Sequence, residues 1–169
     1  LHQPLSQFHA GMPGYEESQA GMAGLAVYLC GGLTRDRLRR LAARVMAVDS
    51  LIAGADFLET FRLLCGDLGF AHRAAYTIAM RVHRGGGLTK DVVYLRGLVA
   101  LLDDLAEGHE FEKLLVGKVA LAHMDIVEEL WWRRIIASGP LRPRYLDSPL
   151  ARERLAGLPG GSGVAQLIE

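Results

Sequence analysis

The sequence predicts an all-α protein, and three observations support this fold class. Apolar residues recur at helical spacing in several stretches. Glycines, prolines and capping residues divide these stretches into segments of helical length. No run of useful length alternates apolar and polar residues, as a half-buried strand would require. We therefore expect a single compact multi-helix domain.

Residues that start, cap or end a helix mark the first two expected helices. Glu16 and Glu17 favour a helix start near Tyr15, and Gly31-Gly32 ends that helix near Cys30. Its many small residues allow another helix to approach closely, and they are Ala20, Gly21, Ala23, Gly24 and Ala26. Thr34 is a good N-cap for the second helix. The apolar stripe of that second helix is Leu38, Leu41, Val45, Val48 and Ile52.

Three arginines, Arg37, Arg40 and Arg44, lie on a different face of this second helix. A basic stripe of this kind suits an acidic partner, and it equally suits a solvated helix surface. The sequence alone leaves both interpretations open.

Asp56 can cap a third helix beyond Gly54, with Phe57, Phe61 and Leu64 on its core side. A fourth helix is expected over residues 72–84. Its inward face is predicted to hold Tyr76, Ala79, Met80 and His83. A fifth is expected from Lys90, capped by Thr89, and its helically spaced apolar residues predict a central position. They are Tyr94, Leu98, Leu101, Leu102 and Leu105.

A short helical piece is expected over residues 111–115 and a longer helix over 124–136. Two prolines, Pro140 and Pro143, then forbid the helix from continuing. Residues 157–169 are rich in glycine, so we expect a domain that spans residues 1–156, followed by a loose tail.

The composition excludes some classes of function. Lys and Arg total 19 and balance 19 Asp and Glu, so no global field favours nucleic acid or an anionic membrane. Glycines interrupt the longest uncharged run, residues 18–34, which argues against a membrane span. Cys30 and Cys65 lie in apolar helical contexts. We expect buried free thiols, a reducing compartment and a cytoplasmic location.

The most distinctive local feature is the stretch 81–97, in which three glycines separate two expected helices. Glycine lets the backbone approach a ligand closely, and the free N–H groups of the following helix suit a small anion. Arg81, Arg84 and Lys90 lie close by in sequence. The spacing is not that of a phosphate-binding Walker loop. A glycine C-cap followed by a capped helix with solvated cations accounts for the same residues.

Known catalytic spacings do not occur in the sequence. None of the six histidines belongs to a His-x-x-x-His pair, which would place two metal ligands on one helical face. There is also no Gly-x-Ser-x-Gly turn, and neither cysteine has an evident histidine partner. The residues by themselves therefore predict a soluble helical domain with a candidate anion-binding turn.

An ordered series of motifs, however, resembles a known family. The most specific are Glu59-Thr60-Phe61-Arg62, Arg81-Val82-His83-Arg84-Gly85-Gly86, Thr89-Lys90-Asp91, Tyr94-Leu95-Arg96-Gly97 and Gly117-Lys118. Together with residues 3–5, 11–15 and 142–146, they resemble the flavohaemoglobin expression-modulating proteins named for a Gln-Glu-Gly-Leu-Ala motif. The eukaryotic relatives of these proteins are the tubulin tyrosine carboxypeptidases.

The resemblance implies a zincin-like metallopeptidase that removes a C-terminal residue. In the family, two histidines of a His-Glu-x-x-x-His helix and the glutamate of the Gln-Glu-Gly-Leu-Ala motif hold zinc, and the helix glutamate activates water. Here Gln19-Ala20-Gly21-Met22-Ala23 occupies the second motif, so Ala20 replaces the ligating glutamate. The chain begins at Leu1, after the position where the first motif is expected. We expect this chain alone to bind no zinc and to be inactive.

The resemblance also bears on substrate binding. A carboxypeptidase must hold the free carboxylate of a peptide or protein C-terminus, which arginines and helix N-termini do well. We therefore assign Arg81, Arg84, Lys90 and Tyr94 to substrate binding. For Asp91 and Tyr94, helix capping and core packing are equally good explanations.

Three hypotheses follow. The chain is the C-terminal part of a zinc carboxypeptidase whose catalytic segment lies upstream. Alternatively it is a pseudoenzyme that keeps the carboxylate pocket without the metal, unless Glu16 or Glu17 replaces the missing ligand. A third possibility, from a different class, is a helical interaction module that uses Arg37, Arg40 and Arg44.

Overall fold

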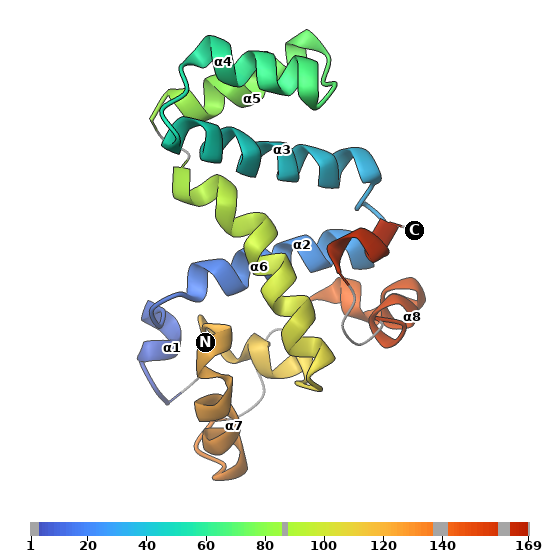
Figure 1. The fold of residues 1–169 in the computed structure, drawn as a ribbon. Helices are drawn as coiled ribbons and strands as arrows, with labels where there is room; N and C mark the ends of the chain where they lie inside the picture. Colours follow the sequence, from blue (N-terminus) through green and yellow to red (C-terminus); the bar gives the residue numbers. More distant parts are fainter. Residues whose placement is uncertain (1–3, 86–87, 137–141, 159–162, 169) are drawn as a thin grey trace. The chain divides into compact units, whose positions relative to one another are not determined.

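The computed structural model describes residues 4–85, 88–136, 142–158 and 163–168, and these residues contain helices but no strand (Figure 1). The all-α prediction is therefore confirmed. The chain divides into two compact units, and the boundary falls inside α6 (Leu88–Ala106). Unit 1 comprises Leu1–Leu33 and Arg96–Glu169, and unit 2 comprises Thr34–Leu95. No described helix combines the length and the apolar character that crossing a bilayer demands.

Unit 1 is built on α2 and on the part of α6 that follows Leu95. Its α-helices are α1 (Gln7–Ala10), α2 (Tyr15–Leu29), α7 (Met124–Trp132) and α8 (Pro149–Ala156). Its short 3-10 turns are η2 (Phe111–Val116), η3 (Leu121–His123), η4 (Arg144–Asp147) and η5 (Val164–Ile168).

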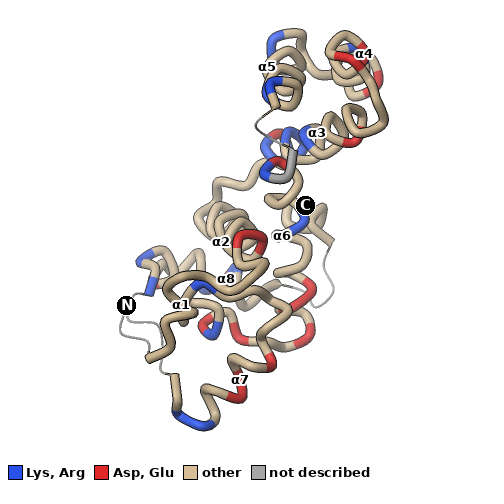
Figure 2. The backbone as a smooth tube through the Cα atoms, turned by 90° about the vertical axis from the view of Figure 1, so that its left-hand side faces the viewer, with Lys and Arg blue, Asp and Glu red and all other residues tan. Residues whose placement is uncertain are grey.

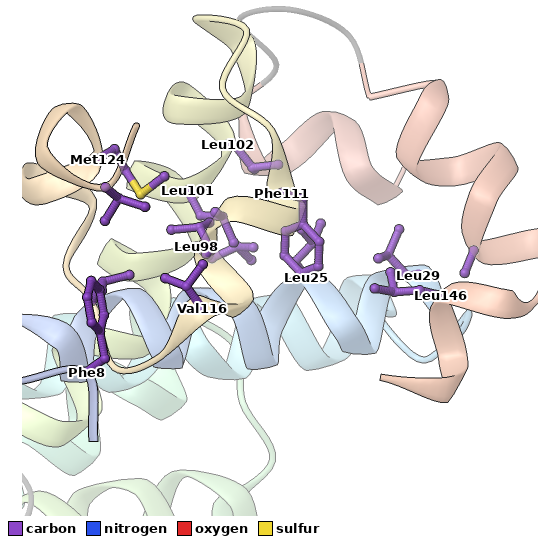
Figure 3. Close-up of a cluster of buried hydrophobic side chains, with 14 of the residues drawn as sticks. Phe8, Leu25, Leu29, Leu98, Leu101, Leu102, Phe111, Val116, Met124 and Leu146 are labelled. Carbon is purple, nitrogen blue, oxygen red and sulfur yellow. The ribbon is translucent and has the colours of Figure 1, made fainter. Parts of the chain in front are cut away.

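The core of unit 1 forms where α2 faces α6 (Figure 3). Leu25 and Leu29 from α2 and Leu98 and Leu101 from α6 are fully buried. Apolar residues of the later turns and helices complete the cluster, among them Phe111, Val116, Met124, Leu146 and Leu167. Leu98 and Leu101 confirm the prediction that this helix is central.

Two glycines bring α2 and α6 into backbone contact. A Cβ placed on Gly21 would overlap the carbonyl oxygen of Gly97, and a Cβ on Gly97 would overlap that of Glu17. Only glycine fits at such a distance, so the small residues expected to admit a second helix do so at Gly21, and the partner is α6.

Unit 2 consists of α3 (Arg35–Ile52), α4 (Phe57–Arg62), the π-helical turn η1 (Leu63–Asp67), α5 (His72–His83) and the start of α6. Two of the three predicted caps, Thr34 and Asp56, are confirmed. Thr34 Oγ1 accepts a hydrogen bond from the Arg37 N–H at 3.2 Å. Asp56 and Glu59 form a reciprocal capping box, with both bonds at 2.8 Å.

The buried face of α5 differs from the predicted one. Its buried residues are Ala75, Ile78, Ala79 and Val82, which join the core of unit 2 with Ala43, Ala47, Val48 and Leu64. Tyr76 is 55% exposed and Met80 is 36% exposed, so the prediction was wrong for both. Ile52 is 73% exposed, because it occupies the last position of α3 beside the turn at Gly54.

Other predictions also need correction. α6 begins at Leu88, so Thr89 lies in the first turn rather than at the N-cap. Gly86 and Gly87 lie outside the described residues, while Gly85, with a φ of 83°, begins the turn after α5. Both cysteines are free, but Cys30 is exposed rather than buried.

The C-terminal expectations have mixed outcomes. α7 ends at Trp132, four residues before the predicted end. The backbone leaves the helix there, since Arg134 has a φ of 57°. A domain ending at residue 156 stays a prediction, as does the loose tail. Leu167, within that tail, is buried against the core of unit 1.

Candidate functional site

A buried carboxylate holds one of the predicted substrate-binding arginines in unit 2. Asp91 lies in the first turn of α6 and its side chain is 0% exposed. The Nε of Arg81, near the end of α5, donates to both Asp91 oxygens, at 2.7 and 2.8 Å. A charged donor held by two acceptors is fixed in orientation. Asp91 therefore positions the Arg81 guanidinium.

A second arginine approaches the same carboxylate. Arg44 Nη1, from α3, lies 3.9 Å from Asp91 Oδ1. Its Nε is buried and has no hydrogen-bond partner among the described residues. The side chains of Arg44 and Arg81 are 31% and 30% exposed, so solvent reaches part of both. Two guanidinium groups and one carboxylate leave net positive charge at a partly buried position, and such a position can bind an anion.

The other predicted binding residues are less firmly held. Arg84, just beyond α5, and Lys90, in the first turn of α6, are exposed. Tyr94, one helical turn after Lys90, is half-buried. Arg81 is thus the one predicted binding residue that the structure joins to another charged group in the described part of unit 2.

Basic residues recur along α3 and α5, as Figure 2 shows in blue. Along the sequence, Arg44 belongs to one predicted stripe with Arg37 and Arg40. In the structure Arg40 pairs with Asp36 in solvent, at 2.8 Å, whereas Arg44 turns towards Asp91. The sequence offered no local signal for this pairing, because α3 and α6 are brought together only by the fold.

His83 is held by hydrogen bonds within unit 2. Its Nε2 lies 3.0 Å from Thr60 Oγ1, and Thr60 in turn lies 3.2 Å from Ser50 Oγ. The ring also makes an edge contact with Phe57, with centroids 5.7 Å apart. Thr60 is fully buried. Two motifs of the sequence series, 59–62 and 81–86, therefore meet through Thr60 and His83.

The segment that resembles the Gln-Glu-Gly-Leu-Ala motif, residues 19–23, lies in α2 of unit 1. Ala20 is 9% exposed, and its methyl group offers no ligand atom. Glu17, one turn earlier, is bound at both oxygens by Arg96, with Nε to Oε1 at 2.8 Å. No three His, Cys, Asp or Glu residues in the described part of the chain are grouped to hold a metal ion. The described residues therefore do not fit zinc.

A second polar pair lies in unit 1 beside a cavity of about 210 Å³. His109 Nδ1 is 2.8 Å from Asp104 Oδ1, while Asp104 Oδ2 is buried without a partner. The hydrogen bond to Asp104 raises the pKa of His109. Burial raises the pKa of Asp104, and the bond to His109 opposes that rise. The cavity is also lined by Leu102, Leu105, Ala106, Phe111, Glu112, Leu155 and Leu158.

Taken together, the fold and the arginine cluster define an all-α protein with a positively charged, partly buried site. The chain matches the model of the family described as microtubule-associated tyrosine carboxypeptidase over residues 1–158, and it belongs to that family. This match confirms the resemblance to tyrosine carboxypeptidases that the motifs predicted. None of the curated proteins and none of the solved structures compared with the chain matches it.

Proposed function

We propose that this chain holds the free C-terminus of a peptide or protein at the arginines around Asp91. The observation that carries the proposal is the orientation of Arg81. Its Nε donates hydrogen bonds to both oxygens of the buried Asp91, while 30% of its side chain is exposed to solvent. The family indicates the ligand, since a carboxypeptidase acts on a chain end that carries a carboxylate. Guanidinium groups bind carboxylates with two parallel hydrogen bonds.

Arg84, Lys90 and Tyr94 complete the proposed binding surface. The two exposed cations add attraction for an anionic chain end, screened by salt because they lie in solvent. The half-buried Tyr94 offers an aromatic ring and a hydroxyl donor. We expect each to contribute less than Arg81, because a group free in solvent must be ordered when it binds.

Hydrolysis is a separate part of the proposal. In the family we expect zinc to polarise the scissile carbonyl and activate water. Ala20 stands where the third ligand is expected, and both Glu17 oxygens are already held by Arg96. We propose that this chain by itself binds a C-terminus without cleaving it. A pseudoenzyme that retains the pocket would also bind a C-terminus without cleaving it. An Ala20→Glu variant of the full reading frame separates the pseudoenzyme from a zinc carboxypeptidase whose catalytic segment lies upstream.

We also propose a cytoplasmic location. The support is that Cys30 and Cys65 are both free thiols, and that Cys30 is exposed. Exposed thiols persist where the compartment is reducing.

The proposed function can be tested by fluorescence anisotropy with a labelled peptide that ends in tyrosine. We expect the free-carboxylate peptide to bind at least about tenfold more tightly than the same peptide with a C-terminal amide. Arg81→Lys keeps the charge but loses the planar fork, so it should remove most of that difference. Arg73→Gln is the matched control, because Arg73 is an exposed arginine of the same helix.

Two results would contradict the proposal. Equal binding of the carboxylate and the amide would show that the chain end is not recognised. Unchanged binding in Arg81→Lys together with a loss in Arg73→Gln would show that charge in general, rather than the oriented guanidinium, attracts the peptide.

A further inference from the structure

We propose that Arg44 and Arg81 are the two arms of a site for one singly charged carboxylate, and that Asp91 sets this selectivity by cancelling one of their two positive charges. The inference rests on the proposed function. It adds Arg44 as a second binding residue and specifies the charge of the ligand. From the sequence, Arg44 belonged to a stripe that suits either a solvated surface or an acidic partner, and Asp91 had no predicted binding role.

Arg44 carries a hydrogen-bond donor that no described residue uses. Its Nε is buried and has no partner among the described residues. A buried donor without an acceptor is costly, and native proteins generally satisfy such groups with protein atoms, water or ligand. Asp91 does not satisfy it, because no hydrogen bond joins Arg44 Nε to that carboxylate and Arg44 Nη1 stays 3.9 Å from Asp91 Oδ1. Arg44 Nε therefore offers a donor that an acceptor from outside the cluster can use.

Arg44, Arg81 and Asp91 also lie together in space. Arg44 comes from α3, Arg81 from α5 and Asp91 from α6, so three elements of unit 2 converge on one point. Asp91 is 0% exposed, and it anchors the arms from inside while each arm remains about 30% exposed. A ligand that arrives from solvent meets guanidinium donors rather than the carboxylate. A carboxylate has two acceptor oxygens in one plane, which matches guanidinium donors.

The net charge of Arg44, Arg81 and Asp91 also favours a singly charged ligand. Two guanidinium groups and one carboxylate leave a single net positive charge, which one carboxylate neutralises. A phosphate monoester dianion would leave an uncompensated negative charge near Asp91, and that is costly in a partly buried site. The exposed Arg84 and Lys90 change this balance little, because water and salt screen them.

The test compares two small probes by isothermal titration calorimetry with the whole chain. They are N-acetyltyrosine, a monocarboxylate, and phenyl phosphate, which is a dianion at about pH 8 because its second pKa is near 6. We expect wild type to bind N-acetyltyrosine at least about tenfold more tightly than phenyl phosphate. Arg44→Gln should weaken N-acetyltyrosine binding by about tenfold or more, and Arg73→Gln should leave it unchanged. Asp91→Asn should shift the preference towards phenyl phosphate.

Asp91 is fully buried, so if Asp91→Asn does not fold, Arg44→Gln decides the question alone. Wild-type affinity in Arg44→Gln, or a wild-type preference for phenyl phosphate, overturns the inference. If binding depends on Arg81 but not on Arg44, the inference fails and the proposed function stands. If wild type binds neither N-acetyltyrosine nor a tyrosine-ended peptide, the proposed function fails, and the inference falls with it.

Discussion

Gly21 and Gly97 meet where α2 crosses α6, so closely that a side chain on either would overlap the backbone of the other helix. Gly21 belongs to the segment at the zinc-ligand motif and Gly97 to the motif 94–97. Both glycines therefore have a structural explanation. They let α2 and α6 approach closely beside Leu25 and Leu98, which belong to the buried cluster of unit 1.

Gly21→Ala should therefore destabilise unit 1. The added methyl meets a carbonyl of α6 and must push the helices apart, at a cost of about 3 kcal/mol or more. Gly24→Ala is the matched control in the same helix, because its Cβ would meet Leu98 at an ordinary 3.4 Å. Alanine favours a helix over glycine by about 1 kcal/mol, so this control should be neutral or stabilising. Urea unfolding measures both, and equal stability of the two variants would refute the crossing described here.

Thr60 should stabilise unit 2 through its hydroxyl group. Its Oγ1 is the shared partner of His83 and Ser50, and the residue is fully buried. Thr60→Val keeps the shape but leaves both partners unsatisfied, so we expect a loss of about 1–3 kcal/mol. Thr60→Ser keeps the hydroxyl and removes one methyl, at a cost of about 1 kcal/mol. Chemical denaturation distinguishes them, and a valine variant at least as stable as the serine variant would argue against the network.

The His109–Asp104 pair should make stability depend on pH. The hydrogen bond to Asp104 raises the pKa of His109 above its ordinary 6.5. The folded state therefore binds this proton more tightly than the unfolded state does. The resulting stabilisation is fully present below pH 6.5 and is lost as pH rises through the folded-state pKa.

We test this with His109→Gln, whose deficit in unfolding free energy relative to wild type should shrink as the pH rises above 6.5. Asp104 acts in the same direction at lower pH, because burial raises its pKa above 3.8. His72→Gln, at an exposed histidine of α5, serves as the control. A deficit that stays constant across this pH range would show that His109 stabilises the fold by packing alone.

Zinc should not co-purify stoichiometrically with this chain. Ala20 offers no ligand atom, and Glu17 is engaged by Arg96. Metal analysis by mass spectrometry should find zinc well below one ion per chain, and incubation with a tyrosine-ended peptide should release no tyrosine. Stoichiometric zinc together with hydrolysis would contradict both the assignment at Ala20 and the proposed inactivity.

Much of the fold could be predicted because its signals are local. Thr34 and Asp56 cap the helices expected of them, since a cap bonds to an N–H only three residues away. The exposed positions of Tyr76 and Met80 were missed for a related reason. Helical spacing fixes which residues share a face, but the neighbouring elements decide which face is buried, and on α5 it runs through Ala75 and Ile78.

The candidate site was only partly predictable, because its contacts are not local. The arginine and lysine residues of 81–90 indicated a site for an anion, and Arg81 does lie beside the buried Asp91. Neither the Asp91–Arg81 pair nor the approach of Arg44 can be read from spacing, since each joins different helices. Along α3, Arg44 looks like Arg37 and Arg40, and only the packing of unit 2 separates it from them.

The most direct test of the central proposal observes the arginine side chains themselves. In a ¹⁵N-labelled chain, the Nε–H resonances of Arg81 and Arg44 are followed by NMR during titration with a tyrosine-ended peptide. We predict saturable shifts of both resonances with the free-carboxylate peptide and none with the C-terminal amide, because both side chains face a partly exposed site around Asp91. Unshifted Arg81 and Arg44 resonances, in a chain that nonetheless binds the peptide, would contradict the proposal.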